Sequence, residues 1–106
     1  MTKLKLTLAC GAYDRTRALI EGGVQPEGIE LNFLPLGPGE IFWRMLNNRE
    51  FDASEMSLST YTILRSQGDE RFIALPVFPS RVFRHGCIYV NSAAGVQRPQ
   101  DLKGKR

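Results

Sequence analysis

The chain has 106 residues, 42% of them hydrophobic and 24% charged, so it is long enough for one small domain with a hydrophobic core. The net charge is +3, but residues 101–106 hold three bases and one acid, and the 11 basic and 10 acidic residues before them leave only +1. Most of the net positive charge therefore comes from these last six residues. Because no stripe of arginine and lysine interleaved with aromatic residues is present either, we expect no nucleic-acid partner.

No segment has the character of a membrane anchor. Residues 1–8 mix lysines with leucines and lack the continuous apolar run of a signal peptide. No other apolar run is long enough to span a bilayer. We therefore expect a cytoplasmic protein without membrane insertion.

Periodicity and the positions of glycine and proline divide the chain into alternating strands and helices. The expected elements are a strand at 4–10, a helix at 13–21, a strand at 29–34, a helix at 40–48, a weak strand at 51–56, a helix from about Ser57 to Gly68, and strands at 72–78 and 86–90. In the first strand, Leu4, Leu6 and Leu8 form one apolar face. This order predicts an α/β fold with a largely parallel sheet.

The segment 40–48 has the clearest helical pattern. Glu40 and Arg44 stand four residues apart and are expected to pair on its exposed side. The apolar side chains expected on its other side or in the core are Ile41, Phe42, Trp43, Met45 and Leu46.

The runs at 72–78 and 86–90 are almost continuously apolar, which is typical of central strands buried on both faces. Pro76 indicates that the first run bends or ends early. Cys87 in the second run and Cys10 in the first strand are expected to be small buried thiols, and a disulfide would require the two strands to be close. One histidine and two cysteines give no metal-ligand pattern.

The turn between the two apolar runs carries Arg81, Arg84 and His85, the only histidine of the chain. Arginine binds carboxylates through two parallel hydrogen bonds, and histidine transfers protons near neutral pH. The turn therefore predicts a site where an anionic small molecule is held. The alternatives are that the arginines are solvated or ion-paired and that His85 is a hydrogen-bonded structural residue.

Two further loops are expected at the carboxyl ends of the strands, where ligands bind in open α/β sheets. One contains Tyr13, Asp14 and Arg15 at a helix N-terminus. The other contains Ser57 and Ser59, also at a helix start. In both loops helix capping is the alternative role. Glu55, which is costly to bury unpaired, is expected to be exposed, ion-paired or functional.

Six segments together carry a family resemblance: LACGAYDRTR at 8–17, PEGI at 26–29, EIFWRML at 40–46, FDASEMSLS at 51–59, the turn at 78–85, and DLKGKR at 101–106. They resemble the 4,5-dihydroxyphthalate decarboxylase family, which is similar in fold to type 2 periplasmic binding proteins. The resemblance implies a two-lobed protein with its ligand between the lobes. Residues 1–106 would be the N-terminal part of lobe one, truncated before the second lobe, and we expect this piece alone to be inactive.

The resemblance implies non-oxidative decarboxylation of 4,5-dihydroxyphthalate to protocatechuate and carbon dioxide. Arg81 and Arg84 would hold the retained carboxylate, and hydroxyl groups or Asp14 would hold the ring hydroxyls. His85 is the first candidate for the acid that protonates the ring, and Glu55 the second. The alternative is a periplasmic solute-binding protein that delivers an anionic or aromatic ligand to an ABC permease. The cofactor, including a divalent metal, and the oligomeric state remain open.

Overall fold

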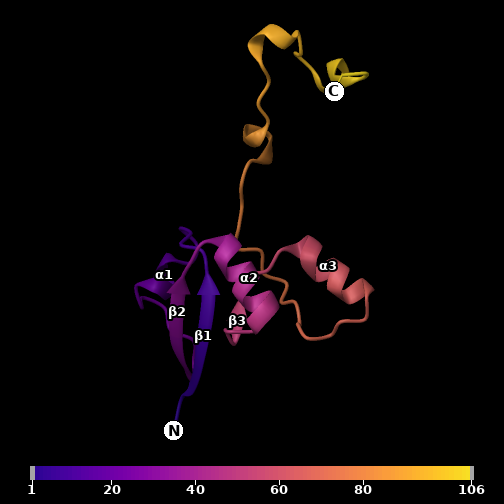
Figure 1. Ribbon diagram of the computed structural model, residues 1–106. Coiled ribbons are helices and arrows are strands. Elements are labelled where there is room, and N and C mark those ends of the chain that lie inside the picture. The colour runs from indigo at the N-terminus through magenta and orange to yellow at the C-terminus, as the bar shows by residue number, and fades with distance from the viewer. Residues whose placement is uncertain (1, 106) are drawn as a thin grey trace.

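The computed structural model describes residues 2–105 and is an α/β structure built on one sheet of three parallel strands (Figure 1). The strands are β1 (Leu4–Cys10), β2 (Ile29–Pro35) and β3 (Ala53–Ser54), in the order β2-β1-β3. β1 pairs with β2 along its whole length and with β3 only at Leu8 and Ala9. The α/β class is therefore confirmed, and all three strands end at one carboxyl edge.

Three α-helices connect or follow the strands: α1 (Arg17–Ile20), α2 (Pro38–Asn48) and α3 (Leu58–Ser66). α2 starts with a proline in its first turn and ends at Arg49, whose left-handed backbone (φ 51°) lets its N–H donate to the Met45 carbonyl. α3 is capped at its N-terminus by Ser57, whose hydroxyl accepts the Thr60 N–H at 3.4 Å. Both helices therefore follow the expected boundaries closely.

α1 is shorter than the helix expected over residues 13–21, because it begins only at Arg17. The residues before it form a hydrogen-bonded turn centred on Thr16. Its hydroxyl accepts the Tyr13 N–H at 3.0 Å and lies 2.9 Å from the Gly11 carbonyl, to which it donates. A threonine side chain thus takes the place of helical backbone bonds in this turn.

The hydrophobic core lies between α2 and the sheet. Its buried members are Ala9, Ile41, Met45 and Phe51, surrounded by the partly buried Leu34, Leu36, Phe42, Met56 and Phe72. Trp43, which was expected in the core, is 62% exposed, because it lies two positions from Ile41 and so points to the other side of α2. Leu4, Leu6 and Leu8 alternate with Ala9 and so lie on the opposite face of the sheet, where Leu4 is 61% exposed.

The central strands expected at 72–78 and 86–90 are absent from the described residues, which is a correction to the sequence analysis. Residues 79–105, hereafter the arm, run away from the sheet, as the orange and yellow chain in Figure 1 shows. The radius of gyration is accordingly 19.0 Å, against about 13 Å for a compact domain of this length. A strand needs a hydrogen-bonding neighbour, and β3 offers an edge of only two residues.

The arm contains three short 3₁₀ turns at Arg84–Cys87, Ser92–Ala94 and Pro99–Leu102. Cys87 lies in the first of them and is exposed, so the expectation of a buried thiol is wrong there, whereas Cys10 is buried as expected. Both cysteines are free thiols. Between residues 2 and 105, none of the helices is long and apolar enough to cross a membrane.

Candidate functional site

A carboxylate stands at the carboxyl edge of the sheet, directly after β3. The backbone of Glu55 is fixed there because its N–H donates to the Ala9 carbonyl at 3.0 Å. Its side-chain Oε2 accepts the Gly11 N–H at 3.0 Å and the Tyr13 hydroxyl at 3.3 Å. Glu55 is half-buried. The end of β3 and the loop after β1 are thus joined through one carboxylate oxygen.

The loop after β1 is shaped so that Tyr13 reaches Glu55. Thr16, which is only 9% exposed, stabilises the turn through its hydroxyl, which accepts the Tyr13 N–H and donates to the Gly11 carbonyl. The Tyr13 ring packs directly on Gly11: a Cβ at that position would lie 2.6 Å from the ring carbon Cζ. Glycine is therefore required at residue 11 for the tyrosine to take this position.

The electrostatics of the edge raise the pKa values of two neighbouring groups. Burial, followed by the negative charge of Glu55, raises the pKa of the Cys10 thiol from 9.0 to about 11. Burial and then the hydrogen bond to Glu55 raise the pKa of Tyr13, against a smaller opposing effect of the Ser80 hydroxyl. At neutral pH both groups are hydrogen-bond donors beside an acceptor carboxylate.

Arg15 connects this loop to the start of the arm. Its guanidinium donates from Nε at 3.1 Å and from Nη2 at 2.6 Å to the carbonyl oxygen of Pro79, 64 residues later. The Arg15 Cζ also lies 5.5 Å from the centre of the Tyr13 ring. Tyr13 therefore contacts both Arg15 of its own loop and Glu55, which the sequence placed in a different segment.

The remaining predicted residues lie close to this cluster in sequence or on the arm. Ser57 and Ser59 follow Glu55, and their hydroxyl oxygens are 2.8 Å apart. Ser57 also caps α3, which is the alternative role considered for it. Asp14 is exposed on the loop after β1.

Arg81, Arg84 and His85 lie on the arm and are exposed. The His85 ring stands edge-on to Phe83, with 5.1 Å between ring centres. Within residues 2–105 none of these three side chains has a hydrogen-bond or ion-pair partner. The structure therefore does not bring them into contact with the Tyr13–Glu55 cluster.

The sequence did not predict three groups that contribute to the site: the Cys10 thiol, the Thr16 hydroxyl and the Pro79 carbonyl. Thr16 has a local signal, a hydroxyl residue five positions after a glycine that ends a strand. The Pro79 carbonyl has none, because a backbone oxygen is independent of residue type. No group of three or more His, Cys, Asp or Glu side chains that could hold a metal occurs between residues 2 and 105.

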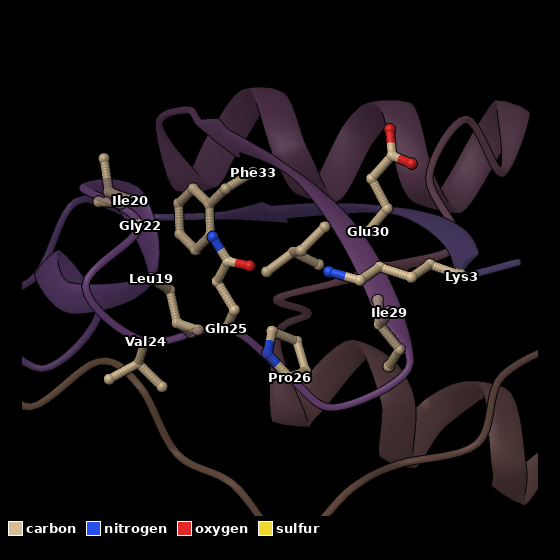
Figure 2. A pocket seen from close by; sticks show the side chains of 11 residues that line it. Lys3, Leu19, Ile20, Gly22, Val24, Gln25, Pro26, Ile29, Glu30 and Phe33 are labelled. Atoms are coloured by element: carbon tan, nitrogen blue, oxygen red, sulfur yellow. The ribbon is translucent and has the colours of Figure 1, made fainter. Parts of the chain in front are cut away.

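Two hollows in the described part of the surface are shallow. Figure 2 shows the first, of about 240 Å³, on the face of the sheet beside α1 and β2, among residues such as Leu19, Phe33 and Lys3. The second, of about 230 Å³, borders the loop at Tyr13 and Asp14. Both are smaller than the roughly 300–1,000 Å³ of typical ligand pockets, so neither encloses a small molecule by itself.

The structure is thus a parallel α/β sheet with a carboxylate, a phenol and an arginine at its carboxyl edge, which is the edge where open α/β sheets bind their ligands. No family model matches the chain. Over all 106 residues the chain is 47% identical to 4,5-dihydroxyphthalate decarboxylase of Comamonas testosteroni and 44% identical to that of Pseudomonas putida. It spans 32% and 41% of the lengths of these relatives. The resemblance to 4,5-dihydroxyphthalate decarboxylases is thereby confirmed.

Proposed function

We propose that this chain contributes to a carboxy-lyase that converts 4,5-dihydroxyphthalate to protocatechuate and carbon dioxide. The observation that carries the proposal is the identity of 47% and 44% to two proteins of that name along the whole chain. The polar cluster at the carboxyl edge of the sheet supports it, because it supplies hydrogen-bonding groups suited to a hydroxylated ring.

The reaction replaces one carboxylate of the ring by hydrogen. A proton is added to the ring carbon that bears the departing carboxylate, and the hydroxyl para to that carbon stabilises the intermediate. The bond to the carboxylate then breaks, its electron pair restores the aromatic ring, and carbon dioxide leaves. The protein must therefore hold the other carboxylate, hold the hydroxyls and supply one proton.

We assign these tasks to the residues as follows. Glu55 is an acceptor in the structure, because Gly11 and Tyr13 both donate to it, and it is suited to accept a further hydrogen bond from a ring hydroxyl. The arm carries the other groups: Arg81 and Arg84 for the retained carboxylate and His85 for the proton. Supporting contacts to the ring are assigned to Tyr13, Asp14, Ser57 and Ser59.

We further propose that the sheet is the core of one lobe of a type 2 periplasmic-binding-protein-like fold. The order β2-β1-β3 and the parallel pairing support this, as does the gathering of polar groups at one edge. Closure of a second wall over that edge would exclude water from the reacting ring, a task for which the two shallow hollows are insufficient.

The test uses the product of the complete reading frame that encodes this chain, beside the 106-residue chain itself. Each is incubated with 4,5-dihydroxyphthalate, with and without a divalent metal, and protocatechuate and carbon dioxide are quantified. Turnover by the product of the complete reading frame supports the proposal. Saturable binding without product would instead indicate a solute-binding protein. The absence of both binding and turnover would refute both functions.

Single variants then separate the roles. His85→Ala should abolish turnover while retaining substrate binding, whereas Arg81→Ala should weaken binding. Arg17→Ala is the matched control for the arginine variant, because Arg17 is an exposed arginine whose partner is the nearby Glu21, at 3.7 Å. Unchanged turnover in His85→Ala would remove His85 as the proton donor, and Glu55→Gln would be examined next.

A further inference from the structure

The arm is joined to the sheet by Arg15. Its guanidinium donates two hydrogen bonds to the Pro79 carbonyl, at 3.1 and 2.6 Å. The same guanidinium lies over the Tyr13 ring, with Cζ 5.5 Å from the ring centre. We propose that Arg15 is a positioning residue, which fixes Pro79, the start of the arm, beside the loop that carries Tyr13. The inference rests on the proposed function, because the arm carries Arg81, Arg84 and His85.

Arg15 is suited to this role because little else holds the arm. Within the described part of the chain, the other side-chain hydrogen bonds of residues 79–105 are local to the arm, such as that from Lys105 Nζ to the Ala94 carbonyl. The Ser80 hydroxyl is close enough to Tyr13 to oppose the rise in the pKa of its phenol. Pro79 and Ser80, consecutive residues of the arm, therefore both lie near the loop after β1.

The geometry also limits what else Arg15 can do. Its Nε and Nη2 form one of the two paired-donor edges with which a guanidinium grips a carboxylate, and that edge is occupied by Pro79. Arg81 and Arg84 have no such engagement within residues 2–105. We therefore assign the substrate carboxylate to the arm arginines and the placing of the arm to Arg15.

Chain geometry sets how closely this contact restrains the proposed site. Arg81 lies two residues after Pro79, so its Cα stays within about 7 Å of the Pro79 Cα, and the Cα of His85 stays within about 20 Å. Loss of the contact removes this limit on their distance from the loop after β1. A residue that acts in this way should matter only as long as the arm residues that it positions are present.

Limited trypsin digestion tests the contact without any activity. In the product of the complete reading frame, cleavage after Arg81 is compared with cleavage after Lys103, farther along the arm, by mass spectrometry. Arg15→Ala should accelerate the first relative to the second by about three- to tenfold, since two hydrogen bonds from a charged donor are lost. Arg15→Lys, which cannot present a fork, should show a smaller increase, and the control Arg17→Ala none. An unchanged ratio in Arg15→Ala, or equal acceleration at both sites, would overturn the proposal.

A double-mutant cycle tests the consequence for turnover. If Arg15 acts through the arm, Arg15→Ala lowers kcat/KM by about tenfold or more in the wild-type background but by less than about twofold in the Arg81→Ala background. Additive losses, with an unchanged digestion ratio, would mean that Arg15 binds the substrate itself. If the wild type shows no turnover, the proposed function fails, while the digestion ratio still decides whether Arg15 holds the arm.

Discussion

The hydroxyl of Tyr13 lies 3.3 Å from Oε2 of Glu55, although 42 residues separate them in the chain. The contact depends on the parallel pairing of β1 with β3, which places the loop after one strand beside the end of the other. It also depends on Gly11, whose lack of a side chain leaves space for the tyrosine ring. The sheet thus creates a polar cluster at its carboxyl edge, where open α/β sheets bind their ligands.

Replacing Tyr13 by phenylalanine should weaken this cluster without removing it. Glu55 would keep the Gly11 N–H and lose the phenol, so we expect the free energy of unfolding to fall by about 0.5–1.5 kcal/mol. Urea denaturation followed by circular dichroism measures this. Tyr89→Phe is the control, because Tyr89 is 89% exposed and should show no change. Equal stability of both variants would mean that the Tyr13–Glu55 contact contributes nothing in solution.

Thiol reactivity should distinguish the two cysteines. Cys87 is exposed and should react quickly with a disulfide reagent at pH 8, whereas Cys10 is 4% exposed with a thiol pKa of about 11 and should react only on unfolding. The measurement is the number of thiols per chain that are labelled rapidly in the native protein, and we expect one. Cys87→Ser should remove the rapid phase, and rapid labelling of Cys10 in that variant would contradict the buried position.

The Cys10 thiol should also make stability fall at alkaline pH. Its folded pKa lies above the unfolded value of 9.0, so the folded state retains its proton where the unfolded state has lost it. The stabilisation is therefore complete below pH 9 and is lost between pH 9 and about 11, by at most about 3 kcal/mol. Urea denaturation at pH 8 and pH 10 should show a smaller loss in Cys10→Ala than in the wild type. Equal losses would exclude this contribution.

The sequence predicted the first half of the chain better than the second, for a physical reason. The patterns of β1, β2, α2 and the start of α3 are local, since alternation, a helical apolar face and a capping hydroxyl such as that of Ser57 act over a few residues. The apolar runs at 72–78 and 86–90 have strand composition, but strands also require pairing, which composition does not provide. The same holds for the site: Tyr13, Arg15 and Glu55 could be proposed singly, whereas their contact required the sheet register.

Arg44 should contribute to stability in a pH-dependent way. Its guanidinium pairs with Glu40 at 2.8 Å and Glu50 at 2.7 Å, and its hydrogen bond to Glu50 is the main reason why the pKa of Glu50 lies below its usual value. A lowered folded pKa means that the stabilisation is present above the unfolded pKa of 4.5 and is lost as the pH falls through the folded one. Thermal melts of Arg44→Met should accordingly depend less on pH between 6 and 3 than those of the wild type. Identical pH profiles would contradict the pairing, and Arg17→Ala serves as the exposed-arginine control.

Ile41 should be the most sensitive position of the core. It lies on the side of α2 that faces the sheet, is fully buried, and belongs to the cluster that includes Ala9 and Phe51. Truncation of its side chain therefore leaves a cavity. We expect Ile41→Ala to cost about 2–5 kcal/mol of unfolding free energy, by the loss of buried methyl groups and the cavity. Ile63→Ala on α3 is the matched control: Ile63 is 56% exposed, and its truncation should cost less than about 1 kcal/mol. Both are measured by urea denaturation at neutral pH. A cost at residue 63 equal to that at residue 41 would mean that α3 is covered in solution, and that its apolar side belongs to a larger core than the one between α2 and the sheet.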